Sequence, residues 1–225
     1  LLAALLMIGT QAGFTFSGLK DFMAGGRELA HAELIGALLI AGFGTLISLF
    51  PFHSWAAPAY ASAPAPVAMM HAGVLKKFGL YGLFMFQPLM ETGFLPWTNI
   101  LLVLLVCNVI WVGYVTVNQK RLDLLLGNSS VMHMGYIFLA FAALVASGSA
   151  EANPWALKGA ALLMLAHGLT IALLFLLCGQ IEKQTGTLEI NSLGGLSTRL
   201  PRMAFVFGLA GMASIGLPGL ANFPG

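Results

Sequence analysis

The sequence predicts an all-α integral membrane protein, a bundle of about six to seven transmembrane helices. Of its 225 residues, 59% are hydrophobic and 8% are charged, whereas an ordinary soluble domain carries roughly a quarter charged residues. The mean hydropathy is +0.90. Apolar runs near the length of a bilayer-spanning helix, about 20 residues, recur along the chain. We expect residues 1–225 to form a single transmembrane domain, an internal fragment of a longer protein.

The first two spans are expected before the first proline. Residues 1–14 form the end of one span, and residues 34–50 form the next. The polar connection between them carries ionisable side chains, namely Lys20, Asp21, Arg27, Glu28, His31 and Glu33. Proline lacks the backbone N–H and clashes with the preceding helical turn, so Pro51 stops or breaks the second span. The sequence therefore predicts a Pro-broken helix near Pro51.

The third span, residues 66–86, begins with Pro66, where the missing N–H costs nothing in the first turn of a helix. It follows a proline-rich connection, residues 51–65. The later spans are expected at residues 98–117, 124–145 and 154–179, with a seventh beginning at residues 203–217.

Two adjacent lysines, Lys76 and Lys77, lie well inside the third span. A lysine at the centre of a span costs about 2.5–3.5 kcal/mol, so its presence indicates function. Adjacent helical residues point about 100° apart. We therefore expect one lysine to face the bundle interior and the other to snorkel or to pack in a protein-filled crevice. Burial penalises the charged amine, so Lys77 could exchange a proton near neutral pH; the alternative is a structural lysine paired with an acid on another helix.

Two histidines, His133 and His167, lie in different apolar spans. Histidine both donates and accepts hydrogen bonds and titrates near physiological pH, so it suits a proton wire. Ser129, Ser130 and Tyr136 lie on or near the His133 face and could order water. Each histidine alone could equally be a hydrogen-bonded packing residue. A bis-histidine haem is a remote competing interpretation, because nothing else in the sequence favours it.

The remaining candidates are weaker. His53 follows the break and could belong to the same wire or cap carbonyl groups that the break frees. His71 and Lys76 are secondary candidates within the third span. Cys107 and Cys178 are small core hydrophobes without a metal-ligand spacing. The sequence contains no nucleophile triad, phosphate loop or nucleotide fingerprint, so we expect no cofactor and no metal in this chain.

Several motifs together resemble a known family. They are PFHSWAAPAYASAPAPV, AGVLKKFGLYGL, SSVMHMGYIFLA, LLMLAHGLTIALLFLLCGQIEKQTGT, LGGLSTRLP and SIGLPGLANFPG, in that order. This series resembles the antiporter-like proton-pumping subunits of respiratory complex I. It is most similar to the chain M type, a relative of the Mrp cation/proton antiporter subunits. The likeness covers nearly the whole chain from about Gly42 onward.

The resemblance implies a fold of about 14 transmembrane helices, of which this chain holds the sixth to part of the twelfth. It implies proton translocation within an NADH:quinone oxidoreductase-like assembly of the bacterial inner (plasma) membrane. Lys77 matches the family's central lysine, and His53, His133 and His167 match its hydrated polar axis. The expected partners are other membrane subunits, which hold the redox cofactors, together with lipid and protons. The net charge of +2 is too small to indicate nucleic acid.

The chain departs from the family at three places. Leu46 stands where the family usually has a lysine paired with a glutamate on an earlier helix. The family's W-L-P-D-A-H reads WAAPAY at residues 55–60, so its aspartate is missing. The acid that usually follows the last motif would come after Gly225.

These departures keep other functions open. The chain could belong to an Mrp-type cation/proton antiporter or to a membrane-bound hydrogenase. Because of Leu46, it could also be a structural subunit that serves assembly and has lost pumping. Whether it belongs to an enzyme is open; it would be a membrane subunit without redox catalytic residues of its own.

Overall fold

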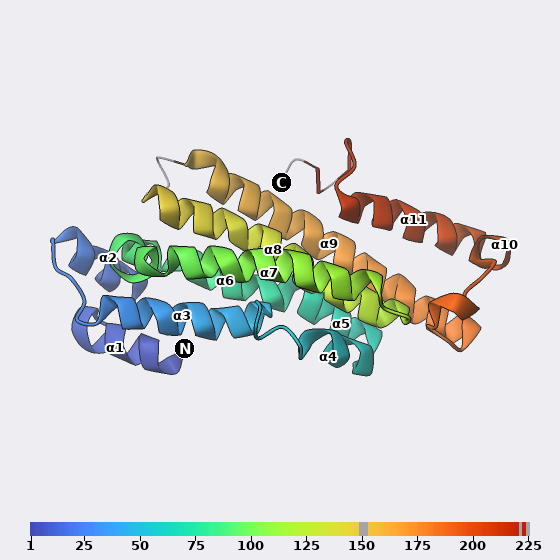
Figure 1. The fold of residues 1–225 in the computed structure, drawn as a ribbon, viewed down its shortest axis with the longest axis horizontal. Helices are drawn as coiled ribbons and strands as arrows, with labels where there is room; N and C mark the ends of the chain where they lie inside the picture. The colour runs from blue at the N-terminus through green and yellow to red at the C-terminus, as the bar shows by residue number, and fades with distance from the viewer. Residues whose placement is uncertain (149–152, 221, 224–225) are drawn as a thin grey trace.

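The computed structural model describes residues 1–148, 153–220 and 222–223. Across these residues every regular element is helical, apart from an isolated β-bridge between Arg121 and Glu189. The helices lie side by side in an elongated bundle (Figure 1). The predicted all-α fold is therefore confirmed.

The α-helices are α1 (Leu2–Ala12), α2 (Phe16–Ala24), α3 (Ala32–Ile47), α4 (Ala56–Ser62), α5 (Ala65–Met70), α6 (Lys76–Met85), α7 (Thr98–Val117), α8 (Leu122–Ser147), α9 (Pro154–Thr185), α10 (Leu196–Arg199) and α11 (Pro201–Ile215). Short π or 3₁₀ turns connect some of them. These turns are η1 (His71–Leu75), η2 (Gln87–Leu89), η3 (Met90–Phe94), η4 (Leu95–Trp97) and η5 (Ile190–Ser192).

Three helical runs in the described chain are long and apolar enough to cross a bilayer: α8, α9 and Gln87–Val117, which includes α7. The pair α1 and α2, bent by 56°, would add a fourth if it forms one span. Helices α3 and α11 are apolar but shorter. The prediction of membrane-spanning helices is thus confirmed, whereas a count of six to seven stays a prediction.

Helix α2 lies where we predicted only a polar connection. Thr15 begins it, because its side-chain oxygen accepts a hydrogen bond from the Gly18 N–H at 3.0 Å. Leu19 is buried, and the Phe16 ring packs against Phe86 with 5.3 Å between ring centroids. These contacts give the segment an apolar face, which stabilises a helix despite Lys20 and Asp21 on its other side.

The predicted break near Pro51 is present, and it begins three residues earlier. Helix α3 ends at Ile47, followed by Ser48 in the left-handed region with φ of 64°. The Leu49 N–H donates to the Gly44 carbonyl oxygen at 2.7 Å, a bond typical of a Schellman helix end. The next helix starts only at Ala56. The early end follows from Pro51, because it has no N–H to donate to the Ile47 carbonyl group and its ring would clash with that group in a continued helix.

The predicted third span, residues 66–86, forms the run α5–η1–α6. It runs from Ala65 to Met85, and a π-helical turn interrupts it directly before Lys76 and Lys77. Such π-turns widen a helix locally and are frequent at functional sites. The chain thus departs from α-helical geometry twice in this region, once at the break before α4 and once at the π-turn after α5.

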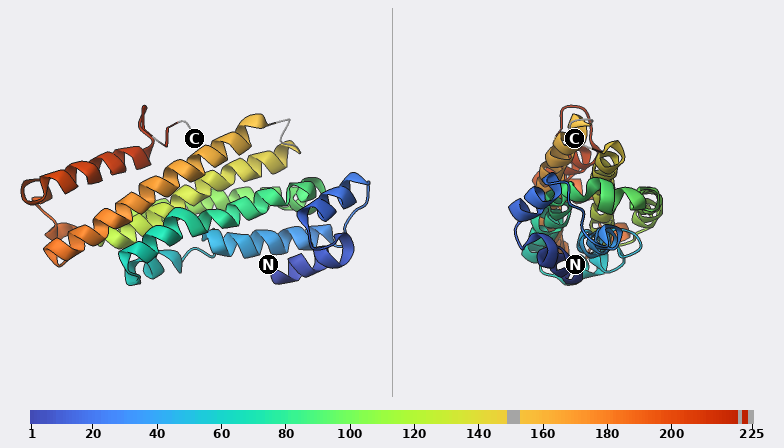
Figure 2. Two further views of the ribbon diagram at one scale, coloured as in Figure 1. Left: turned by 180° about the vertical axis from the view of Figure 1, so that it is seen from behind. Right: turned by 90° about the vertical axis from the view of Figure 1, so that its left-hand side faces the viewer.

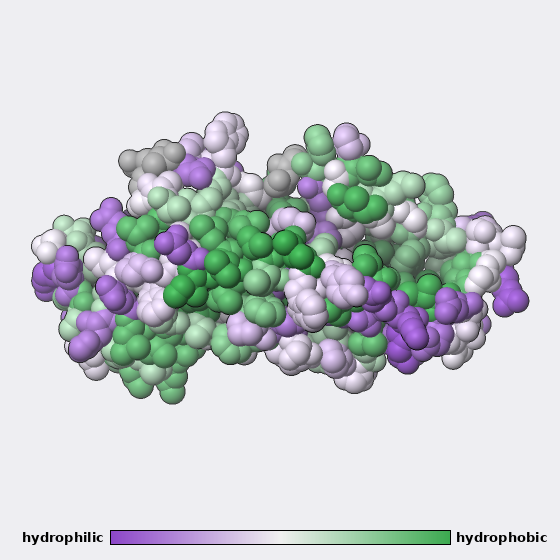
Figure 3. Space-filling view, viewed as in Figure 1, coloured by the Kyte–Doolittle hydropathy of each residue, from purple (hydrophilic) through white to green (hydrophobic). Residues whose placement is uncertain are grey.

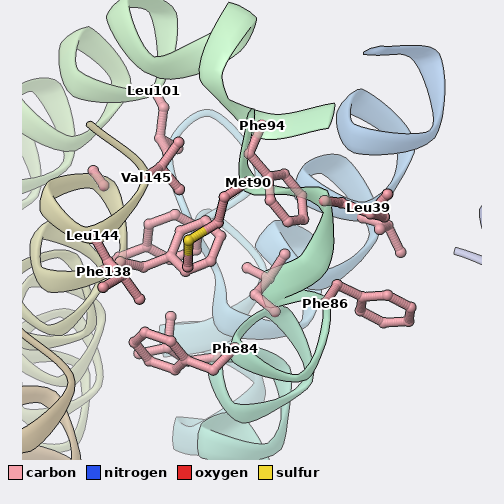
Figure 4. Packing of buried hydrophobic residues seen from close by; sticks show 14 of the residues in the cluster. Leu39, Phe84, Phe86, Met90, Phe94, Leu101, Phe138, Leu144 and Val145 are labelled. Atoms are coloured by element: carbon pink, nitrogen blue, oxygen red, sulfur yellow. The ribbon is translucent and has the colours of Figure 1, made fainter. Parts of the chain in front are cut away.

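Helix α8 packs against α4, α7 and α9, and it lies among them in both views of Figure 2. Helix α3 packs on α6, and α9 also contacts α5, η1 and α11. In one core cluster, the Phe141 ring lies 5.3–5.5 Å from those of Phe84, Phe94 and Phe138. Figure 4 shows Phe84, Phe94 and Phe138 together with Met90 and Leu144 of this cluster. On one face, apolar side chains cover the middle, and many hydrophilic ones lie toward the two ends (Figure 3). This distribution suits a protein surrounded by lipid.

A close backbone contact joins α3 to the turn η3. A Cβ atom added at Gly36 would lie 1.9 Å from the Gly93 carbonyl oxygen. No side chain fits this space, because backbone rather than a flexible side chain would have to move. Glycine at this position therefore lets α3 and η3 approach each other.

The substitution Gly36→Ala should destabilise the folded chain by about 1–3 kcal/mol, because it overpacks this contact. We expect a lower midpoint of thermal unfolding and less chain in membranes. Gly208→Ala on α11 is the matched control, since a Cβ there meets nothing within 4 Å and alanine favours a helix. Equal stability of the two variants would contradict the contact.

Candidate functional site

The strongest cluster of buried polar side chains lies where α6, α8 and α9 meet. Lys77 on α6 is 8% exposed, His167 on α9 is 1% exposed, and Ser130 on α8 is fully buried. His133, one turn after Ser130, joins them and is partly buried. The cluster is surrounded by apolar side chains of the bundle core.

Lys77 reaches this cluster because α9 comes very close to the run that carries it. A Cβ added at Gly168 would lie 2.6 Å from the Gly73 carbonyl oxygen and 3.7 Å from Lys77 Cε. The glycine therefore leaves space for the lysine chain beside His167. The Lys77 ammonium donates a hydrogen bond to the carbonyl oxygen of Ala72 in the π-turn. The π-turn thus supplies the acceptor that holds the amine.

The two predicted relay histidines are in contact. The rings of His133 and His167 stack, with 5.0 Å between centroids and 10° between planes. The Ser130 hydroxyl lies 3.4 Å from Nε2 of His167. Lys77 Cε lies close to Gly168, the residue after His167. Lys77, His167 and His133 are therefore neighbours in the bundle core.

The surroundings of His133 distinguish its two protonation states. Its Nδ1 lies 2.8 Å from the Ser129 carbonyl oxygen, and its Nε2 lies 3.0 Å from the Ser214 carbonyl oxygen. Carbonyl oxygens only accept hydrogen bonds, and a neutral imidazole carries one N–H. A protonated ring can therefore donate to both carbonyl groups, whereas the neutral ring can donate to only one. Ser214 belongs to α11, so this contact also ties α11 to α8.

The cluster borders a cavity. An open, mainly apolar cavity of about 1320 Å³ lies between α8, α9 and α11, and His133 and Ser129 are part of its wall. Tyr136, 44% exposed, lines the same cavity with its ring 6.2 Å from that of His133. A proton released by His133 can therefore leave the bundle core through this cavity.

The other predicted residues lie apart from this cluster. His53 stacks on the ring of Phe50 at 5.3 Å and lies at the break. Its Nδ1 is buried, without a hydrogen-bond partner among the described residues. Lys76 is fully buried, so it packs in a protein-filled crevice and does not snorkel. His71 contacts Tyr60 instead of the cluster.

The bis-histidine haem does not fit this geometry. The His133 and His167 rings lie face to face, so no plane of a porphyrin can pass between their nitrogens. Both nitrogens of His133 already contact carbonyl oxygens. Within the described residues, no group of three or more His, Cys, Asp or Glu side chains could hold a metal ion.

Sequence reasoning missed Asn108, which connects the break to the site. It is fully buried on α7. Its Oδ1 accepts a hydrogen bond from the Phe50 N–H at 3.1 Å, and its Nδ2 donates to the Val131 carbonyl oxygen at 3.1 Å. Val131 follows Ser130 on α8. The signal was a lone asparagine inside an apolar span, since such residues often join helices in membranes.

Asn108→Leu should destabilise the folded chain by about 1–3 kcal/mol, because the buried Phe50 N–H loses its acceptor. We expect faster hydrogen exchange at the Phe50 amide and a lower midpoint of thermal unfolding. Asn118→Leu is the control, since Asn118 caps the exposed end of the same helix. Unchanged exchange at Phe50 in the Asn108 variant would contradict this role.

Comparisons with known proteins show the family and the fold. Residues 1–225 match the family described as "NADH:quinone oxidoreductase/Mrp antiporter, TM". The chain is 36% identical over 207 residues to "NAD(P)H-quinone oxidoreductase chain 4 2" of Microcystis aeruginosa, covering 92% of this chain and 35% of that relative. The chain thus spans about a third of the length of this curated relative.

Two solved structures have a similar fold. Over 99% of this chain and 46% of the other, it matches a chain of respiratory complex I from Thermus thermophilus with bound NADH, with a TM-score of 0.84 and 30% identity. It also matches a chain of the Mrp complex from Dietzia sp. with a TM-score of 0.83 and 26% identity, over 99% of this chain and 24% of the other.

Proposed function

Because this chain belongs to the NADH:quinone oxidoreductase/Mrp antiporter transmembrane family, we propose that it moves protons across a membrane through its buried lysine and histidine side chains. The observation that supports this proposal is that Lys77 lies beside Gly168, next to His167, whose ring stacks on that of His133 at the wall of a cavity. Proton-transfer groups in a bundle core must lie within reach of one another or of shared water.

Each residue has a chemical role in the proposed pathway. Lys77 binds a proton in the bundle core, where the Ala72 carbonyl oxygen holds its ammonium. It passes the proton to neutral His167, directly or through water, and becomes a neutral amine. His167 passes it to His133 through water, because stacked rings form no direct N–H···N bond, and the Ser130 hydroxyl is a partner to the His167 ring. His133 releases the proton to the cavity, where Ser129 and Tyr136 can order water.

His53 has a separate role on the side of the break. It lies among backbone groups that the break frees from helical hydrogen bonding, with a buried Nδ1. We place it there as a relay or as an organising group of the break. Leu46, in the last turn of α3, supplies no charge to this half.

In the proposed assembly, the chain is one segment of a longer subunit. It contributes six to seven spans of an antiporter-like fold, with residues 1–225 as one transmembrane domain. Its partners are other membrane subunits, lipid and protons, and quinone reduction in partner subunits supplies the energy. The location is an energy-conserving membrane, proposed as the bacterial inner membrane.

A second function has specific support. The likeness to a chain of the Mrp complex from Dietzia sp. favours a cation/proton antiporter. Sodium- or potassium-dependent proton movement without electron transfer would identify this function. An assembly-only role, favoured by Leu46, would leave proton movement unchanged when Lys77 is replaced. Measuring proton movement after replacement of Lys77 therefore separates proton pumping and cation/proton antiport from an assembly-only role.

The substitution Lys77→Met in the assembled complex should lower proton translocation by about tenfold or more, because it removes the buried proton carrier. The measurement is the number of protons moved per electron in membrane vesicles, together with the amount of complex. Lys158→Met, an exposed lysine on α9, is the matched control and should leave both unchanged. Translocation at the wild-type level in the Lys77 variant would overturn the proposal.

A further inference from the structure

Lys76 is the most deeply buried charge-bearing residue among those described, and the Lys77 pathway does not use it. Its exposure is 0%, and its Nζ has no hydrogen-bond partner among the described residues. Adjacent helical residues point about 100° apart, so it faces a different side of α6 from Lys77. A buried ammonium without an acid is strongly unfavourable, which makes its presence informative.

The side of α6 that carries Lys76 faces the break. Gly79 lies three residues later on the same face, and a Cβ there would meet Ile47 at 2.7 Å, at the end of α3. Tyr60, on α4 directly after the break, places its ring 5.5 Å from Lys76 Nζ. An aromatic face attracts an ammonium ion, so Tyr60 stabilises the charged state of Lys76 in place of a carboxylate.

Tyr60 also connects Lys76 to the surface. Its hydroxyl lies 3.2 Å from Nδ1 of His71, and the two rings are 5.5 Å apart. Tyr60 is buried, whereas His71 is only partly buried and touches the half-exposed ring of Trp55. A second line of polar groups therefore runs from Lys76 through Tyr60 to His71, on the side of the break.

The two lines meet at adjacent residues of one helix. Lys76 and Lys77 are adjacent residues at the start of α6, so they repel each other when both are charged. In a medium of low dielectric constant this repulsion is large. The arrival of a proton at one amine therefore favours its loss from the other.

We propose that Lys76 is a second proton-carrying residue, which takes up protons from the break through His71 and Tyr60 and thereby drives the proton of Lys77 toward His167. The inference rests on the proposed function. One proton and no electron moves in each step. Protonated His71 gives its Nδ1 proton to the Tyr60 oxygen, and the hydroxyl proton passes to the Lys76 amine through water. His71 ends neutral, Tyr60 is restored, and the charge lies on Lys76.

The test compares a neutral and a permanently charged residue at position 76 in the assembled complex. Lys76→Met cannot hold a proton, and Lys76→Arg cannot release one. If Lys76 must gain and lose a proton, both variants should lower the number of protons moved per electron by about tenfold. If it serves only as a fixed charge against Tyr60, the arginine variant should retain wild-type translocation, which overturns the proposal.

If substitutions at position 76 prevent assembly of the complex, Tyr60→Phe tests the proposed proton uptake by Lys76 instead. It keeps the ring that faces Lys76 and removes only the hydroxyl, so the fold should persist. We expect a loss of translocation of at least about twofold, and wild-type translocation would overturn the second line. Leu80→Met, a buried apolar swap on the same helix, is the control. Failure of Lys77→Met alone to lower translocation would instead overturn the proposed function.

Discussion

The burial of two amines in one helix is the constraint on which the rest of this structure depends. Lys76 and Lys77 lie within a bundle whose core is mainly apolar. An ammonium group in such surroundings needs a carbonyl oxygen, an aromatic face or water. The π-turn before the lysines provides the carbonyl of Ala72 for Lys77, and Tyr60 provides the ring for Lys76. The π-turn thus stabilises the Lys77 ammonium, and α4, which follows the break, stabilises that of Lys76.

The break between α3 and α4 is held by a side chain from a third helix. Asn108 accepts from the Phe50 N–H and donates to the Val131 carbonyl oxygen, so the break is fixed relative to the Ser130 turn of α8. A free N–H group inside a membrane protein is costly unless a protein group or water pairs with it. Asn108 therefore allows the helix to be interrupted at this depth.

The bounds predicted for α7 are those observed, although π and 3₁₀ turns rather than a polar loop lead into it. The sequence was sufficient for the fold class, because that rests on composition and on the length of apolar runs. It was not sufficient for α2, because the buried face of that helix forms only through contact with Phe86, which is distant in sequence. The stacking of His133 on His167 could be expected only from the resemblance, whereas the partners of Lys76 and Asn108 depend on how α4, α7 and α8 cross.

Three buried polar atoms without hydrogen-bond partners among the described residues are in the break or face it, namely Ser48 Oγ, His53 Nδ1 and Lys76 Nζ. His167 Nδ1, in the cluster with Lys77, is another such atom. Buried polar atoms without protein partners are generally paired with water. Both the break and the His167 cluster are therefore places where this bundle is expected to admit water. Leu46 leaves the last turn of α3 without a charge. Lys76, at the start of α6, is therefore the residue that brings a charge to the break.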